Sequence, residues 1–405
     1  MNSPIASTLS GAFPWPRSLF GAPAAYAELR KERPIVRLSM PSGKPVWLIT
    51  RYDDVRSILS DPRVSSDTRN PGYPALSYSP APERRSLLNM DPPDHTVLRR
   101  ILVKNFLIKR VESMRADIQA LVDSKIDTML VTPERRVDLV QNFALPVPST
   151  VLSWILGVRQ ADIPFFNKVS EAIVMHSASS SPDAPKRTLE SMMTLEKYIA
   201  ELVSERESQD PGDDILGRLI AESRAGAITR QDVINTGVLV LIAGHDTTAS
   251  MTALGALTLL QHPDQLAELR AKPELIHDAV EELLRYLSIV HLVVRRVAKE
   301  DIEIGGEVIP AGEGIIPLNF SANRDDAHYP DAATFDIHRK ARDHFAFGYG
   351  IHQCVGQPLA RVELHVIFET LLRRIPTLRL ATPVEDIRFK SGAPIHGVLE
   401  LPVTW

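Results

Sequence analysis

The sequence predicts a mainly α-helical chain with small antiparallel β-sheets. Helical periodicity fills the middle of the 405 residues, whereas regular β signals are short and lie near the two ends. Because the strands do not alternate with helices, a doubly wound parallel sheet is disfavoured. We expect a single domain over residues 1–405.

The expected elements follow from the spacing of apolar residues along the chain. Helices are expected over 51–60, 96–130, 189–207, 232–261, 264–271, 274–287 and 357–374. Strands are expected over 35–39, 46–50, 301–317 and 397–403. These elements predict β-rich portions near 35–50, 301–317 and 385–403 and a helical core over 90–287 and 357–374. The segments 65–87 and 176–187, rich in Ser and Pro, are expected to be irregular loops.

The charge balance gives no sign of a nucleic-acid partner, because 46 Lys+Arg stand against 50 Asp+Glu for a net charge of −4. The first 19 residues lack the basic and apolar regions of a signal peptide. The most apolar segment, 233–260, contains His245 and Asp246 at its centre, which favours a core helix over a membrane span. We therefore expect a cytoplasmic monomer that binds no membrane.

The sequence contains one cysteine, Cys354. A single thiol excludes an intramolecular disulfide and every metal site built on several cysteines. It lies in the segment 347–356, FGYGIHQCVG, whose glycines allow close backbone approach to a flat group or a positive φ. A helix is expected to begin just after it, and a helix N-terminus stabilises the thiolate that a metal needs. A buried thiol without a function, and a nucleophile paired with His352, are the alternative interpretations.

Two pairs of charged residues have helical spacing. Glu282 and Arg285 are three residues apart, and His95 and Arg99 are four apart, so the members of each pair share a helix face. Such a pair on its own is typical of a solvated surface.

The apolar helix 232–261 carries the run AGHDT at 243–247. Burial of an acid in the middle of an apolar helix costs free energy, so an acid at this position suggests a functional reason. A polar seam between packed helices is the alternative to a functional site.

The cysteine segment resembles the haem-binding loop of the cytochrome P-450 superfamily, F-G-x-G-x-H-x-C-x-G in its common bacterial form. The runs at 95–99, 243–247 and 282–285 resemble three further motifs of that superfamily and occur in its order. The resemblance extends from about residue 91 to about 374. It implies the cytochrome P-450 fold with haem b, whose iron the Cys354 thiolate ligates. The sequence departs from the pattern at Phe345, where bacterial relatives often have leucine, and in lacking a proline at 288–292.

The resemblance also implies a role for each motif residue. Haem contacts are implied for His95, Arg99, Ala243, Gly244, Arg296, Phe347, Gly348, His352, Cys354 and Gly356. The propionates are assigned to His95, Arg99, Arg296 and His352, because cationic side chains suit carboxylates. Asp246 and Thr247 are the implied catalytic pair, which supplies protons to dioxygen. The Glu282–Arg285 pair is implied to be structural.

By resemblance, the protein inserts one atom of O2 into a lipophilic small molecule by hydroxylation or epoxidation. Electrons come from NAD(P)H through a ferredoxin and a ferredoxin reductase, and a polyketide, a terpenoid or a xenobiotic is the expected substrate. The residues expected to line the substrate pocket are aliphatic: Leu239, Val240, Val290, Leu292 and Val293. A basic docking patch for an acidic redox partner is expected at Arg99, Arg100, Lys104, Lys109, Arg110 and Arg361. A peroxygenase of the same fold, which the Asp246–Thr247 pair disfavours, and a non-catalytic haem-thiolate sensor are the alternatives.

Overall fold

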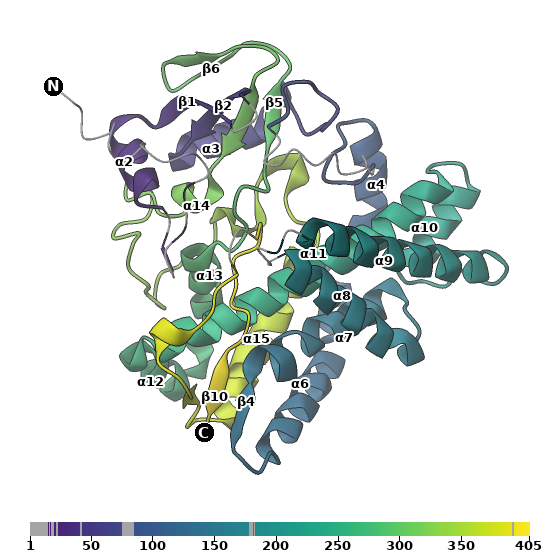
Figure 1. Ribbon diagram of the computed structural model, residues 1–405, viewed down its shortest axis with the longest axis vertical. Helices are drawn as coiled ribbons and strands as arrows, with labels where there is room; N and C mark the ends of the chain where they lie inside the picture. Colours follow the sequence, from purple (N-terminus) through teal and green to yellow (C-terminus); the bar gives the residue numbers. More distant parts are fainter. Residues whose placement is uncertain are drawn as a thin grey trace. The chain divides into compact units, whose positions relative to one another are not determined.

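The computed structural model describes residues 15, 17, 20–21, 23–40, 43–74, 85–177, 181, 183–390 and 393–405 (Figure 1). Its α-helices are α2 Ala24–Glu32, α3 Tyr52–Ser60, α4 Asp94–Val103, α5 Ile108–Ser113, α6 Arg115–Leu130, α7 Pro146–Leu156, α8 Ile163–Ser177, α9 Ala184–Glu207, α10 Ile215–Arg224, α11 Arg230–Leu260, α12 Pro263–Ala271, α13 Ile276–Leu287, α14 Asn319–Ala322 and α15 Gln357–Arg374. Its strands are β1 Ile35–Ser39, β2 Pro45–Ile49, β3 Val64–Ser65, β4 Arg136–Asp138, β5 Arg296–Ala298, β6 Ile302–Ile304, β7 Glu307–Ile309, β8 Gly314–Pro317, β9 Arg379–Leu380 and β10 Pro402–Thr404. Among the described residues, none of the helices combines the length and the apolar character needed to cross a membrane.

The structure divides into two compact units, each built from two segments of the chain. Unit 1 comprises Met1–Asp94 and Glu281–Cys354, and unit 2 comprises His95–Val280 and Val355–Trp405. Unit 1 contains the larger sheet, and unit 2 contains most of the helices.

The sheet of unit 1 has five strands in the order β1-β2-β8-β5-β3. β8 is buried at every position, and its branched residues Ile315 and Ile316 suit a strand covered on both faces. Helix α3 packs beside this sheet, where Tyr52, Val55 and Ile58 belong to a buried cluster with strand residues. The cluster gives α3 and the sheet a common core.

Unit 2 is organised around α11, which begins with a capping box. The Thr229 hydroxyl accepts from the Asp232 N–H, and the Asp232 carboxylate accepts from the Thr229 N–H. Helix α7 packs on α11, and α15 packs on both α6 and α11, as Figure 1 shows for α6 and α15. A Cβ at Gly255 of α11 would lie 2.5 Å from the Phe368 ring of α15, so glycine permits this close helix contact. A small sheet, β4-β10-β9, completes the unit.

The fold class is confirmed: the chain is mainly helical, and its sheets are small. One strand pairing differs from the prediction, because β2 pairs with β8 in parallel and the five-stranded sheet is therefore mixed. The helix 357–374 is confirmed at both ends by α15, and 51–60 and 232–261 correspond to α3 and α11.

Several predicted boundaries are wrong. The single helix over 96–130 is three helices, α4 to α6. Leu107 leaves the helical region with φ −59° and ψ 139° before α5, and Met114 separates α5 from α6. The strand over 301–317 is the three strands β6 to β8, since Gly305, Gly306 and Gly312 turn the chain with positive φ. The strand over 397–403 is confirmed only near its end, at β10.

The predicted loops and the remaining helices also differ from expectation. The 176–187 loop is helical at both ends, where α8 ends and α9 begins. Of the 65–87 loop, residues 75–84 lie outside the described residues. The helices α7, α8 and α10 were not predicted; α7 carries prolines at 146 and 148 within its first turn, where proline is tolerated.

Candidate functional site

The loop that carries Cys354 is held in shape by backbone hydrogen bonds and glycines. The Cys354 N–H donates to the Phe347 carbonyl (2.8 Å), and the Gly348 N–H donates to the Phe345 carbonyl (2.9 Å). Gly348 and Gly350 have φ of 71° and 73°, values that favour glycine. A Cβ at Gly350 would also lie 2.2 Å from the Leu59 carbonyl oxygen. The loop therefore presents Cys354 exposed, three residues before α15 begins.

His352 of this loop is held by a chain of hydrogen bonds within unit 1. Its Nε2 lies 2.9 Å from the Ser66 hydroxyl. The Ser66 N–H donates to Asp91 Oδ1 (2.8 Å), and the Ser65 hydroxyl donates to Asp91 Oδ2 (2.5 Å). Asp91 thus fixes the backbone that orients His352.

Arg296, on β5 of unit 1, is a buried cation. Burial lowers the pKa of its guanidinium. Among the described residues its guanidinium hydrogen-bonds to the backbone carbonyl of Arg295 (2.8 Å) and to no carboxylate. A ligand with a carboxylate would supply the missing countercharge.

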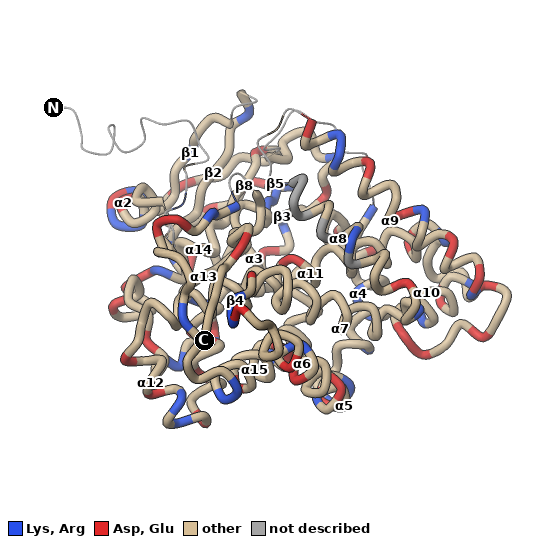
Figure 2. The backbone as a smooth tube through the Cα atoms, turned by 60° about the horizontal axis from the view of Figure 1, so that its bottom comes forward, with Lys and Arg blue, Asp and Glu red and all other residues tan. Residues whose placement is uncertain are grey.

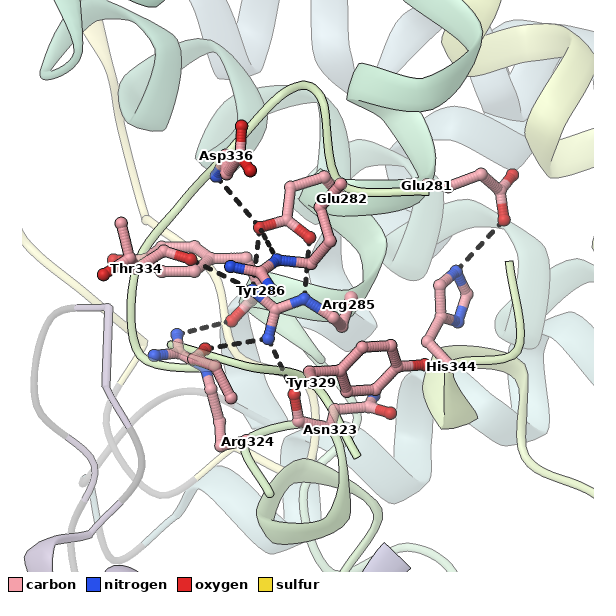
Figure 3. Close-up of polar contacts among 12 residues, drawn as sticks. Glu281, Glu282, Arg285, Tyr286, Asn323, Arg324, Tyr329, Thr334, Asp336 and His344 are labelled. Atoms are coloured by element: carbon pink, nitrogen blue, oxygen red, sulfur yellow. Dashed lines mark hydrogen bonds and ion pairs between the residues drawn. The ribbon is translucent and has the colours of Figure 1, made fainter. Parts of the chain in front are cut away.

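The Glu282–Arg285 pair is fully buried rather than on a surface (Figure 3). Two parallel hydrogen bonds of 2.7 Å join the Arg285 guanidinium to both oxygens of the Glu282 carboxylate. The remaining donors of Arg285 reach the carbonyls of Asn323, Ala332 and Thr334. The fork ties the end of α13 to the loop that follows α14, which is a structural role.

On α11, in unit 2, the AGHDT run has two polar side chains with different partners. The Thr247 hydroxyl donates to the Ala243 carbonyl (2.7 Å), the i−4 contact typical of threonine in a helix. Asp246 instead forms an ion pair with Lys390, a residue of the C-terminal segment. A Cβ at Gly244 would lie 2.7 Å from the Cδ2 atom of Leu152 on α7, so α7 and α11 pack closely at this position.

His245 directly precedes Asp246 on α11. It is fully buried, and burial lowers its pKa to about 4, with the positive charge of Lys390 acting in the same direction and Asp246 opposing it. At neutral pH the ring is therefore uncharged.

His95 and Arg99 share one face of α4, as their spacing predicts. His95 is buried, and Arg99 is partly exposed. Both belong to unit 2, as does Gly356, which directly precedes α15.

Comparison with known proteins decides the family. The family model described as Cytochrome P450 matches residues 4–388. The chain belongs to the cytochrome P450 family. Cytochrome P450 105A3 of Streptomyces carbophilus is 44% identical over 407 residues, which cover 99% of this chain and 97% of that protein. Vitamin D3 dihydroxylase of Streptomyces griseolus is 44% identical and covers 98% of each chain.

A solved structure gives the same result for the fold. The mycinamicin VIII C21 methyl hydroxylase MycCI of Micromonospora griseorubida, bound to mycinamicin VIII, is similar with a TM-score of 0.89 and 41% identity, covering 97% of this P450 and 100% of that chain. The P450 is therefore a haem-thiolate monooxygenase, an oxidoreductase that inserts oxygen from O2 into a small molecule.

The residues of this P450 fit a haem on their own chemistry. Unit 1 carries an exposed thiol at Cys354 and the buried cation Arg296, which has no carboxylate partner among the described residues. A thiolate suits the iron, and a guanidinium suits a propionate.

The residues predicted to contact the substrate belong to both units and differ in burial. Leu239 and Val240 are on α11, where Val240 is buried and Leu239 is half-buried. Val290 and Leu292 line a cavity of about 10 Å³ within unit 1, room for no more than a water molecule. Leu292 has φ 59° and packs against the core cluster that includes Val36 and Leu48, and Val293 is half-buried.

Sequence reasoning missed two partners of the motif residues, Lys390 and Ser66. They lie 144 and 286 residues along the chain from Asp246 and His352. Neither is part of a local motif, so nothing in the spacing of residues indicates them.

Proposed function

We propose that this P450 hydroxylates a lipophilic small molecule and that residues 1–405 act as a single P450 domain. The observation that carries the proposal is the Cys354 loop, in which two positive-φ glycines and two backbone hydrogen bonds hold the only thiol of the sequence at the start of α15. A thiolate at this position is the axial ligand that a P450 needs.

The proposed haem contacts are those that the resemblance to the family implies, and the side-chain chemistry suits them. Cys354 would ligate the iron, and His95, Arg99, Arg296 and His352 would bind the propionates. The remaining proposed contacts are Phe347, Gly348 and Gly356 beside the cysteine and Ala243 and Gly244 on α11. When bound, the haem supplies the activation of dioxygen.

The protein supplies the protons through α11. Thr247 Oγ1, which donates to the Ala243 carbonyl, holds a proton that it could donate to the dioxygen substrate. Asp246 replaces that proton, since its carboxyl is the nearest acid in the sequence. This pair also separates the monooxygenase from a peroxygenase, which needs no proton supply of this kind.

The substrate is proposed from the apolar lining and from the relatives. Leu239, Val240, Val290, Leu292 and Val293 would contact it, and all five are aliphatic. One relative is named for the dihydroxylation of vitamin D3, and another for hydroxylation of the C21 methyl of mycinamicin VIII. Both names describe replacement of a C–H bond by C–OH, which we propose here for a polyketide, a terpenoid or a xenobiotic.

Electrons are proposed to come from NAD(P)H through a ferredoxin and a ferredoxin reductase in the cytoplasm, with the P450 acting as a monomer. The expected docking residues belong to unit 2, where Arg100, Lys104 and Lys109 are exposed. Arg110 instead forms an ion pair with Asp213, and Arg361 donates to Gln357, so these two have local partners. Figure 2 shows acidic and basic residues interspersed along α9 and α10 of the same unit.

The test has two stages. The reduced, carbon monoxide-bound protein should show the absorbance band of thiolate-ligated haem, and Cys354→His should lose that band while still binding haem. A screen of lipophilic compounds for a low-spin to high-spin shift then selects candidates for turnover with NADPH, ferredoxin and reductase. Absence of the thiolate band would overturn the proposal. Turnover with H2O2 but not with NADPH would favour the peroxygenase, and no turnover with either would favour the sensor.

A further inference from the structure

The carboxylate of Asp246 is bound by a lysine that lies 144 residues later in the chain. Lys390 Nζ donates to Asp246 Oδ1 and, at 3.0 Å, to the Ser250 hydroxyl. The Ser250 hydroxyl in turn lies 3.3 Å from Asp246 Oδ1. The side chains of Lys390 and Asp246 are only 5% and 14% exposed, so water screens this ion pair little.

The backbone around Lys390 is built to hold it against α11. The Lys390 N–H donates to the Gly397 carbonyl (2.9 Å), the Leu399 N–H donates to the Arg388 carbonyl (2.8 Å), and Phe389 forms an antiparallel bridge with Val398. A Cβ at Gly397 would lie 2.6 Å from the Ser250 hydroxyl, so glycine lets the segment approach the helix without displacing this hydroxyl. These backbone contacts therefore fix the position of the Lys390 backbone.

The ion pair determines which way Asp246 faces. Ser250 is one helical turn beyond Asp246, whereas the Thr247 hydroxyl points back one turn to the Ala243 carbonyl. The acid and the alcohol therefore have separate partners in this structure. A carboxylate this poorly exposed needs its countercharge, and removal of one partner of such a pair is far more disruptive than removal of both.

Lysine is suited to a contact that must form and break. Its ammonium is a compact charge on a flexible stem with three rotatable donors, unlike the fixed fork of arginine. The neighbouring His245 is uncharged at neutral pH and cannot replace Lys390 as the countercharge.

We propose that Lys390 is a positioning residue for proton delivery, which holds the Asp246 carboxylate beside Ser250 and releases it toward Thr247 once in each proton transfer. On release, the Asp246 carboxylate takes up one proton that water delivers from bulk solvent and gives it to Thr247 Oγ1, while Thr247 passes its own proton to the dioxygen substrate. The carboxylate then returns to the ammonium, so charge and protons balance over the cycle. The inference rests on the proposed role of Asp246 and Thr247.

The test is a double-mutant cycle in the haem-loaded protein. Lys390→Met removes the charge at similar volume, Asp246→Asn removes the acid, and the double variant combines them. Lys390→Arg keeps the charge. Lys272→Met is the matched control, because Lys272 forms an exposed ion pair with Glu268 within the same unit. NADPH oxidation is measured in air-saturated buffer with a plant-type ferredoxin and its reductase in excess, so that electron supply does not limit the rate.

If Lys390 acts through Asp246, each single variant slows NADPH oxidation about threefold or more, and the double variant is within about 1.5-fold of Asp246→Asn. Lys390→Arg keeps about half of the wild-type rate or more, and Lys272→Met stays within about 1.5-fold of it. Independent roles would instead multiply the two losses to about ninefold or more, which would overturn the inference. Wild-type rates in Lys390→Met, or in Asp246→Asn, would overturn it equally.

A second readout needs no turnover. Reductive methylation followed by mass spectrometry should modify Lys390 at least about threefold more slowly than Lys272, and Asp246→Asn should remove that protection because the pair is broken. Equal reactivity of the two lysines would contradict the buried pair. A protein without the thiolate band fails the proposed function, whereas a protein with the band and an unaffected Lys390→Met variant fails this inference alone.

Discussion

We predict that the buried carboxyl of Glu363 lowers the stability of this P450 as pH rises and that Glu363→Gln removes this dependence. It lies on α15, nine residues after Cys354, with 2% of its surface exposed. Among the described residues no group forms a hydrogen bond with its Oε2. Burial raises the pKa of its carboxyl from 4.5 to about 8, so the folded protein keeps this group protonated at neutral pH.

The size of the effect follows from linkage. The folded state binds the proton more tightly than the unfolded chain, so the contribution of Glu363 to stability is complete below pH 4.5 and is lost as pH rises through about 8. A shift from 4.5 to about 8, at 1.36 kcal/mol per pKa unit, amounts to about 5 kcal/mol. With about 2.1 cal/mol/K of unfolding entropy per residue, the 405-residue chain changes its Tm by about 1 °C per kcal/mol. The whole shift therefore corresponds to about 6 °C.

Calorimetry of the haem-loaded protein from pH 5 to pH 8 measures this directly. Gln at 363 keeps the shape but does not titrate. About 3.5 kcal/mol of the effect falls between pH 5 and pH 8, so the Tm of Glu363→Gln should gain about 4 °C on the wild type across that range, whatever the offset at pH 5. Glu369→Gln, at an exposed position of the same helix, is the control and should show no such trend. A difference between Glu363→Gln and wild type that stays constant with pH would refute a protonated buried carboxyl.

Three further changes test other parts of the structure. In the same calorimetric series, the wild type should lose up to about 3 kcal/mol of stability relative to His245→Asn as pH falls from 6.5 to 4. The reason is that the unfolded chain binds a proton at His245 in this range, whereas the buried ring of the folded protein, with a pKa of about 4, does not. Gly255→Ala should lower the Tm by about 1–3 °C, since its Cβ would lie 2.5 Å from Phe368 and overpacking typically costs about 1–3 kcal/mol. An unchanged Tm would mean that α11 and α15 separate freely. Arg285→Ala should destabilise by about 3–5 kcal/mol, because the buried Glu282 carboxylate loses both short bonds to Arg285 and keeps only Arg339, at 3.3 Å, as a countercharge among the described residues. The measurement is the yield of protein with the carbon monoxide band, which Lys272→Ala on the surface should retain.

The parts of the fold that the sequence predicts are those with a strong local signal. α15 and α11 have long apolar periodicity and defined starts, and both were predicted closely. The breaks at Leu107 and Met114 have no proline or glycine to mark them, so the sequence predicts one helix where three exist. α7 is buried around most of its surface, and a helix without a polar face has no periodicity to detect. In these segments tertiary packing decides the structure.

The site residues also fall into a group that the sequence predicts and a group that it does not. The residues within a motif, such as Cys354 and His352, are adjacent in sequence, and their loop geometry needs only the local glycines. The partners that orient them are set by the fold: Ser66 reaches His352 from a loop after β3, and Lys390 reaches Asp246 from the C-terminal segment. The Glu282–Arg285 spacing predicts contact between the two side chains but not their complete burial, which depends on carbonyls from residues 323–334.

The Glu282–Arg285 and Asp246–Lys390 ion pairs differ in a way that matches their proposed roles. The Arg285 guanidinium is locked by two bonds to Glu282 and by backbone carbonyls, so no change of rotamer is possible without losing several bonds at once. This pair is therefore suited to a fixed structural role and not to a conformational change. Asp246 binds a single flexible ammonium and one hydroxyl, and it keeps 14% of its surface exposed to water. Its release requires one long side chain to swing, which takes far less rearrangement than opening the Arg285 fork. The chemistry of each cation therefore favours a fixed structural contact for Arg285 and a reversible contact with Asp246 for Lys390.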